Sequence, residues 1–220
     1  MNKNKLKDLK FKENINHSEF FEKWNTFVDS EDCENMMKLK VGIVFGSMSP
    51  MHNGHEALID CALSENDKVV VSLDSFRSQR TEDNPMPLCE RVEAIEKFYK
   101  DNNKVLVQSF VLDYITGSDR TKYWDIWSEK MLSELLKTLN IENFNDISLL
   151  FYTGDEMYLE HLERVLGSHK IRYIDRNSGY YTPVISGTEI RNNPKKYWHN
   201  INDEFKKFFK LKGETEDEKI

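Results

Sequence analysis

The alternation of short apolar runs with amphipathic segments constrains the fold of this 220-residue chain more than any other feature. Runs such as VGIVFG and KVVVSL are rich in β-branched residues and too short for core helices, whereas the segments between them repeat apolar residues at helical spacing. This order predicts an α/β fold, a doubly wound parallel sheet with helices on both faces. We expect strands at 41–46, 68–73, 104–112, 147–154 and 170–175, and helices at 52–64, 88–100, 123–139, 157–167 and 203–210, with a short helix after 188.

The loops that follow the strands form one rim of such a sheet. Ligands of open parallel sheets bind beyond the carboxyl ends of the strands, so the binding site is expected on this rim. The loops at 46–52, 74–80, 113–120, 153–156 and 175–188 would share it.

The chain divides into three parts by composition. Residues 1–38 are polar with one amphipathic patch, which predicts a helical extension that packs on the main domain and whose role is open. Residues 39–210 carry the strand and helix pattern and form the predicted domain. Residues 211–220 are charged and read as a flexible tail.

The overall charge limits the classes of partner. With 31 Lys and Arg against 38 Asp and Glu, the formal net charge is −7, which argues against nucleic-acid binding through a broad basic face. Three scattered cysteines form no CxxC pair and suit a reducing compartment. No signal-peptide pattern or membrane-length apolar run is present, so we expect a cytoplasmic protein without membrane contact, and a homo-oligomer is left open.

A loop of small residues with two histidines is the first candidate for phosphate chemistry. Gly46, Ser47 and Met48 lie between a predicted strand and a predicted helix, where small residues and helical N–H groups favour a phosphate. His52 and His55 are three residues apart and therefore lie on one helix face. Two imidazole donors aimed at one spot suit a polyphosphate that gains charge during a reaction.

Other interpretations of this loop are weaker. The histidines can be incidental at a helix start. A zinc site is disfavoured because His55 begins an HExxH-like stretch in which Ile59 replaces the second histidine. A P-loop kinase and a dinucleotide-binding dehydrogenase are disfavoured because the chain contains neither a Walker A segment nor GxGxxG.

A second cluster lies far along the chain, in ISGTEIR. Ser186 and Thr188 are hydroxyl donors at a predicted helix start, and either can cap that helix. Arg191 follows on the same face, where its guanidinium can fork onto phosphate oxygens. An ordinary capped helix is the alternative. Together with the histidine loop, the cluster predicts a two-sided phosphate clamp.

Together these clusters resemble the nucleotidylyltransferase superfamily, whose signatures are GxFxPxHxGH and ISxTxIR. Here the first reads F-G-S-M-S-P-M-H-N-G-H, with Met48 at the usual Phe position and Ser47 where the closest branch often has Lys. YWDIWSEKM, IDRNSGYYTPVISGTEIRNNPKKYW and DEFKKFF resemble further motifs of one branch, the NMN adenylyltransferase domain of the bifunctional NMN adenylyltransferase/ribosylnicotinamide kinase family. The similarity covers about residues 40–210 and includes no kinase domain, so kinase activity is not implied.

The resemblance implies a Rossmann-like nucleotidyltransferase fold and transfer of AMP from ATP to nicotinamide mononucleotide (NMN), giving NAD and pyrophosphate. By this resemblance His52, His55 and Arg191 are the catalytic residues. Mg²⁺ is the expected cofactor, bound with ATP, and no protein metal site is expected. The expected phosphate-binding residues are Gly46, Ser47, Met48, Ser186, Thr188 and Asp155.

Several residues can contact the acceptor, but each of them can instead have a structural role. Trp124 or Trp127 can stack on a cationic pyridinium ring, and Trp127 is the better candidate for the core. Asp74 can face the ligand or cap a loop, and Asp155 can touch a ribose or cap the next helix.

Three rival functions remain open at this point. The acceptor can be nicotinate mononucleotide, phosphopantetheine or a cytidylyl-transfer substrate. A regulatory protein that senses nucleotides without turnover is an alternative from another class. A purely structural α/β domain would make both motifs coincidental.

Overall fold

The computed structural model describes residues 38–75, 86–112, 120–167, 170–175, 179 and 185–207, without the side chains of residues 120 and 121. The predicted N-terminal extension, apart from its last residue, and the predicted tail lie outside this part of the chain.

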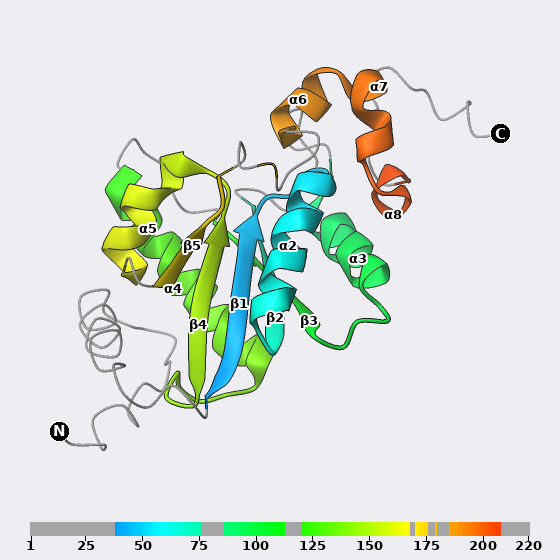
Figure 1. Cartoon of the computed structure of the whole chain (residues 1–220). Helices are drawn as coiled ribbons and strands as arrows, with labels where there is room; N and C mark the ends of the chain where they lie inside the picture. The colour runs from blue at the N-terminus through cyan, green and yellow to red at the C-terminus, as the bar shows by residue number, and fades with distance from the viewer. Residues whose placement is uncertain are drawn as a thin grey trace.

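One five-stranded sheet organises the described chain. The strands are β1 (Leu39–Gly46), β2 (Lys68–Ser75), β3 (Val105–Val111), β4 (Ile147–Thr153) and β5 (Ile171–Tyr173). Their order is β3-β2-β1-β4-β5, and every neighbouring pair is parallel. The predicted parallel α/β fold is therefore confirmed (Figure 1).

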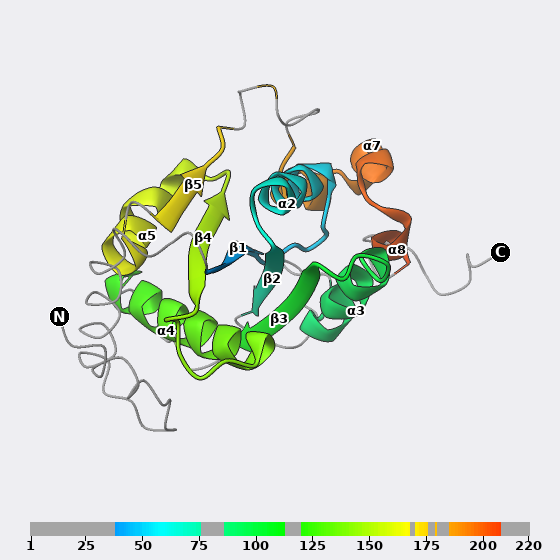
Figure 2. The ribbon, with the colours of Figure 1, turned by 60° about the horizontal axis from the view of Figure 1, so that its bottom comes forward.

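Helices cover both faces of the sheet. Helices α2 (Asn53–Glu65) and α3 (Leu88–Phe98) pack on one face, and α4 (Arg120–Leu139) and α5 (Leu159–Leu166) pack on the other. Figure 2 shows α4 across the sheet from α2.

Alternation along the strands divides the core into these two layers. In β1, Val41 and Ile43 pack with the α4 layer, whereas Val44 packs with the α2 layer. Both layers bury β-branched strand residues, which explains why the strand sequences read as nearly continuous apolar runs.

Two helices begin one or two residues later than predicted, and caps or a 3₁₀ turn explain these differences, whereas α4 begins three residues earlier than predicted. The predicted helix at 52–64 begins after His52, which caps α2. The predicted helix at 157–167 is a 3₁₀ turn, η2 (Glu156–Tyr158), followed by α5. Gly167 ends α5 with φ of 86°, as expected for a glycine stop signal.

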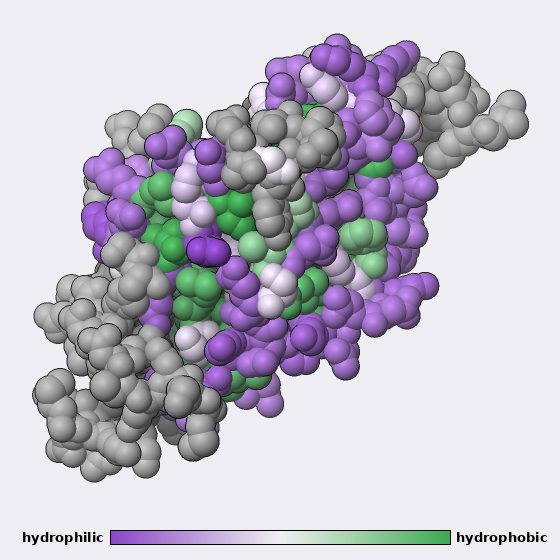
Figure 3. Space-filling model, viewed as in Figure 1, coloured by the Kyte–Doolittle hydropathy of each residue, from purple (hydrophilic) through white to green (hydrophobic). Residues whose placement is uncertain are grey.

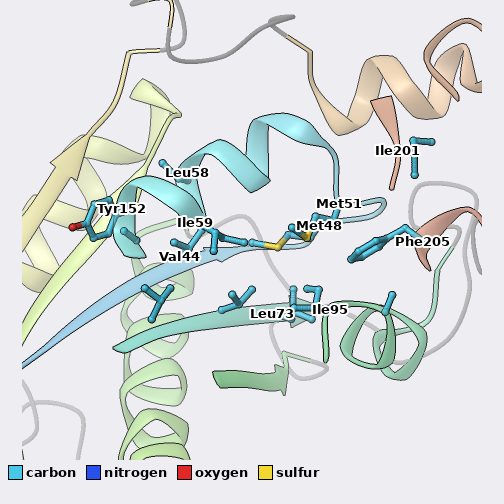
Figure 4. Packing of buried hydrophobic residues seen from close by; sticks show 14 of the residues in the cluster. Val44, Met48, Met51, Leu58, Ile59, Leu73, Ile95, Tyr152, Ile201 and Phe205 are labelled. Carbon is cyan, nitrogen blue, oxygen red and sulfur yellow. The ribbon is translucent and has the colours of Figure 1, made fainter. Parts of the chain in front are cut away.

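Short C-terminal elements lie beyond the carboxyl ends of the strands (Figure 1). They are α6 (Gly187–Asn192), α7 (Pro194–Tyr197), η4 (Trp198–Asn200) and α8 (Asp203–Lys206). Ile201 forms an antiparallel bridge with His52, and Phe205 is fully buried beside Met51 and Met48 (Figure 4). The end of the described chain is thus packed against the loop that follows β1.

Hydrophilic residues cover most of the described surface over α6 and α7 in Figure 3, while apolar residues show over β4 and α5. Among the helices that the structure describes, none has the length and hydropathy to cross a bilayer.

Candidate active site

The sheet reverses its order of connection between β1 and β4. The chain moves from β1 to β2 and β3 on one side and then returns to β4 and β5 on the other. In open α/β sheets ligands bind in the crevice at such a reversal. A cavity of about 310 Å³ lies there, and its lining comes from the loop after β1, the end of β4, η2 and the start of α6. Its lining residues are Phe45, Gly46, Ser47, Met48, Ser49, His55, Leu58, Thr153, Gly154, Asp155, Tyr158, Ser186, Gly187, Thr188 and Arg191.

The loop after β1 presents main chain to the cavity. Gly46 has φ of 150°, a conformation that a Cβ would strain. Ser47 is exposed, whereas Met48 is 1% exposed as a whole residue and its side chain packs among core residues (Figure 4). Met48 also has φ of 44°, so a non-glycine residue holds a left-handed turn where the loop meets the cavity.

Hydrogen bonds at the start of α2 orient the two histidines. The His52 Nδ1 accepts from the Gly54 N–H at 3.1 Å, and the His55 Nδ1 accepts from the His52 N–H at 3.3 Å. A neutral imidazole that accepts at Nδ1 carries its proton on Nε2. The two ring centroids are 4.0 Å apart. The helix cap therefore sets both rings in the tautomer that donates from Nε2.

The start of α6 forms the opposite wall. Ser186 caps α6: its Oγ accepts from the Glu189 N–H at 3.2 Å and lies 2.8 Å from the Glu189 Oε2. Arg191 donates from Nη2 to the Thr188 Oγ1 at 3.1 Å. Gly187 permits this arrangement, because a Cβ there would lie 3.2 Å from the Arg191 Nη1. The predicted cap and the predicted guanidinium face are both present.

Arg191 joins the two predicted clusters directly. Its Nη1 donates to the Ser49 carbonyl at 2.9 Å, across 142 residues of sequence. His55 and Arg191 line the same cavity, as do Gly46, Ser47, Met48, Ser186 and Thr188. His52 is 5% exposed and is absent from the lining, although its ring lies against that of His55. The structure thus brings both stretches together, while their roles stay predictions.

Asp155 also lines the cavity, and it caps η2. Its side chain accepts from the Met157 N–H at 3.1 Å, and its own N–H donates to the Thr153 Oγ1 at 3.1 Å. Both interpretations of Asp155, ligand contact and helix cap, are compatible with this position.

Asp74 and Trp127 contact each other instead of the cavity. The Trp127 Nε1–H donates to the Asp74 Oδ2 at 2.9 Å, and Trp127 is 1% exposed. Burial raises the pKa of Asp74, while the Trp127 hydrogen bond and the charge of Arg91 oppose that rise. Trp127 also meets the Phe45 ring edge-on at 5.2 Å, so it belongs to the core beneath the loop.

Trp124 lies one turn away in an aromatic cluster. It is 8% exposed, stacks on His161 at a centroid distance of 5.3 Å and 15° between planes, and lies 5.3 Å from the Tyr158 ring. Tyr158 lines the cavity, whereas Trp124 and Trp127 do not. Trp124 therefore lies behind Tyr158, and Trp127 lies behind Phe45, and both of these rings line the cavity.

By the resemblance, Arg91 matches an arginine in a helix of the family and was interpreted as structural, and only the structure shows its contact with the loop after β1. Its side chain is 0% exposed and donates to the carbonyls of Met86, Asp74 and Ser47. An arginine on a helical apolar face at ERVEAI was the available signal, because such a group needs buried partners. Among the described residues, no group of three or more His, Cys, Asp or Glu is placed to hold a metal ion.

Comparison with known proteins identifies relatives of the whole region. The chain is 30% identical over 189 residues to the trifunctional NAD biosynthesis/regulator protein NadR of Escherichia coli (strain K12), an alignment that covers 78% of this chain and 41% of that protein. It is 28% identical over 176 residues to a probable nicotinate-nucleotide adenylyltransferase of Fusobacterium nucleatum, covering 71% of this chain and 88% of that one. The chain therefore spans less than half of the first relative and most of the second.

Solved structures give the same picture. A NadR protein in complex with NAD and AMP-PNP superposes with a TM-score of 0.59 at 27% identity, covering 78% of this chain and 48% of that one. A NadR protein in complex with NR superposes with a TM-score of 0.62 at 25% identity, covering 79% and 47%. The model of the cytidylyltransferase-like family matches residues 43–193, a span that contains both walls of the cavity. The chain belongs to the cytidylyltransferase-like family.

Proposed function

We propose that this chain transfers the AMP portion of ATP to nicotinamide mononucleotide, forming NAD and releasing pyrophosphate. The observation that carries the proposal is the shared cavity, which His55 from α2 lines together with Arg191 and Thr188 from α6. Relatives named as NAD biosynthesis proteins and a neighbour bound to NAD and AMP-PNP support it. The domain proposed for this reaction is residues 39–210, and the proposed location is the cytoplasm.

The reaction needs positioning more than proton transfer. An oxygen of the NMN 5′-phosphate attacks the α-phosphorus of ATP, a new P–O bond forms, and the bond from that phosphorus to the bridging oxygen of pyrophosphate breaks. The nucleophile is already an anion, so a general base is not required. The protein contributes by aligning the groups and stabilising charge on the phosphate oxygens.

The tautomer of the histidines suits this role. Because the Nδ1 of His55 accepts from a backbone N–H, its neutral imidazole carries the proton on Nε2, and the same holds for His52. We propose that these donors bind the ATP phosphates as negative charge develops. Arg191, Thr188 and Ser186 would hold the β- and γ-phosphates from the opposite wall, with help from backbone N–H groups near Met48.

Mg²⁺ fits the site as a companion of ATP. Magnesium usually binds through one or two carboxylates together with substrate phosphates and water. Asp155 is a carboxylate that lines the cavity and can serve in this way. When bound, the ion would neutralise phosphate charge, while the residues described above orient the substrates.

The acceptor is the finer part of the proposal. The ring of Tyr158 lines the cavity, and Trp124 packs behind it against Trp127; we propose that a cationic pyridinium binds at this aromatic cluster. Nicotinate mononucleotide is the second candidate, because the Fusobacterium relative that this chain covers almost fully carries that name. A nicotinate ring adds a carboxylate, which would need a cation or amide groups beside it.

The test is incubation of the protein with ATP, Mg²⁺ and one acceptor at a time, followed by chromatography of the dinucleotide and measurement of pyrophosphate. We expect NAD from NMN with a higher kcat/KM than the nicotinate product. A higher kcat/KM with nicotinate mononucleotide would change the proposed acceptor but leave the proposed adenylyl transfer unchanged. ATP binding without pyrophosphate release from any acceptor, including phosphopantetheine, would favour a nucleotide-sensing protein instead.

A further inference from the structure

Arg91 is a buried cation that touches the loop of the proposed active site without lining the cavity. It lies in α3 and is 0% exposed. Its Nε donates to the Met86 carbonyl at 3.2 Å, and its Nη1 donates to the carbonyls of Asp74, at 3.0 Å, and Ser47. One side chain therefore ties the loop after β1 to the end of β2 and to the start of α3. Burial lowers the pKa of Arg91 to about 10, so it remains charged at neutral pH.

The bond to Ser47 orients one peptide group. The Ser47 carbonyl and the Met48 N–H belong to the same planar trans peptide and point in opposite directions. Because Arg91 holds the carbonyl from the α3 side, the N–H is turned away from α3. Met48 is 1% exposed as a whole residue and lines the cavity, while its side chain packs in the core layer (Figure 4). We infer that its main chain is the part that lies beside the cavity.

Met48 needs support to keep this orientation. Its φ of 44° is left-handed, which costs a non-glycine residue roughly 1–2 kcal/mol. The carbonyl before it is bound by Arg91, and the carbonyl after it, on Ser49, is bound by Arg191 at 2.9 Å. One guanidinium thus holds the peptide that precedes the strained residue, and the other holds the peptide between Ser49 and Pro50, one residue further on.

We propose that Arg91 is a positioning residue for adenylyl transfer, holding the Ser47–Met48 peptide so that the Met48 N–H faces the phosphates of ATP. The inference rests on the proposed function and adds to it a residue that does not touch the substrate. The Met48 N–H would then be a preorganised donor, and such donors act mainly on the transition state. Loss of Arg91 should lower kcat more than it weakens ATP binding.

Arg91→Lys is the most informative variant. It keeps a positive charge but replaces the planar fork by a single ammonium, which cannot reach three carbonyls at once. We expect kcat to fall about 10²-fold, as for a misplaced or lost donor, and the KM for ATP to change far less. Wild-type kcat in Arg91→Lys would overturn the proposal.

Ile95→Ala is the matched control for simple destabilisation. Ile95 lies one turn along the same buried face of α3, is 0% exposed, and packs in the same core layer. Its truncation should cost about 2–5 kcal/mol of unfolding free energy while the folded fraction keeps the wild-type kcat. Equal losses of kcat per folded molecule in Ile95→Ala and Arg91→Lys would reduce Arg91 to a structural role and contradict the proposal.

The wild-type protein supplies a measurement that does not depend on turnover or on a folded variant. Titration with ATP should shift the Met48 amide resonance and protect this amide from hydrogen exchange, whereas the Ile95 amide should stay unchanged. An unchanged Met48 amide at saturating ATP would overturn the proposal even if NAD is formed. Conversely, a shifted Met48 amide without NAD formation would retain the positioning role and reject the proposed reaction.

Discussion

The two sides of the proposed active site differ in how their polar groups are held. On the phosphate side, His55, Thr188 and Arg191 line an open cavity, and local caps or loop carbonyls orient them. On the aromatic side, Trp124 and Trp127 are 8% and 1% exposed and already contact each other, His161 and Asp74. The phosphate side is thus preset for a ligand, whereas the aromatic side is packed as core.

This contrast assigns different consequences to mutations on the two sides. Groups that line the cavity and are fixed by their own helix should affect turnover more than folding. Groups that share a buried hydrogen bond should affect folding more than turnover, because removal of one partner leaves the other unsatisfied.

His55→Ala should have the largest effect on activity. Removing one preorganised donor to a developing charge typically costs about 10²–10³ in kcat. Loss of the bond from the His52 N–H should cost only about 1 kcal/mol of stability, so the protein stays folded. Steady-state kinetics and urea unfolding measure the two effects separately.

His199→Ala is the control for that variant, because His199 is exposed in η4 and is not among the residues that line the cavity. It should retain wild-type kcat. Wild-type turnover in folded His55→Ala protein would mean that His55 does not stabilise the reacting phosphates, and that the phosphate side does not affect turnover as proposed.

Arg191→Lys should have the next largest effect. Lysine keeps the charge but loses the fork that contacts both Ser49 and Thr188, and one lost charge-assisted hydrogen bond costs about 1.5–3 kcal/mol. We expect the KM for ATP to rise at least tenfold. Arg172→Lys, at the exposed pair with Glu65, should leave the KM unchanged. If Arg191→Lys had the same KM for ATP as Arg172→Lys, Arg191 would not contribute to phosphate binding as proposed.

Trp127→Phe should act on stability. It removes the donor to Asp74 and leaves that carboxylate without this partner, at a cost of about 1–3 kcal/mol. Trp124→Phe controls for the loss of ring area on the same helix. Chemical denaturation should show the larger loss for Trp127→Phe. A larger effect on the KM for NMN than on unfolding would place Trp127 in the acceptor site instead of the core.

Asp74→Asn should have the smallest effect, a change in how the stability of the protein depends on pH. Burial raises the pKa of Asp74 above its ordinary value of 3.8, so the folded state holds this proton more tightly than the unfolded state. Its contribution to stability therefore declines as the pH rises from that value through the folded pKa.

The stability of Asp74→Asn lacks this decline, because asparagine does not titrate. Between pH 4 and pH 7 the melting temperature of the wild type should therefore fall relative to that of Asp74→Asn. A difference that is constant over this range would mean that the pKa of Asp74 is not raised.

Local patterns predicted most of the fold because strand and helix signals are local. The run VGIVFG specified β1 and the cap at His52 specified the start of α2, within one or two residues. The strand order with β1 in the centre followed only from the structure, since several orders place helices on both faces.

Long-range contacts explain what sequence reasoning did not reach. The bond from Arg191 to Ser49 joins residues 142 positions apart, and no spacing rule indicates it. The burial of Arg91 likewise depends on three carbonyls from separate segments. Trp124 stacks on His161, a residue of α5, and this contact could not be inferred from helical spacing in α4.

The most direct test of the central claim is a crystal structure of the protein with a non-hydrolysable ATP analogue. We predict its triphosphate in the cavity between the loop after β1 and α6, with phosphate oxygens within hydrogen-bonding distance of the His55 Nε2 and the Arg191 guanidinium. A triphosphate bound elsewhere, with His55 and Arg191 both out of reach, would contradict the claim that these two distant stretches form one phosphate site.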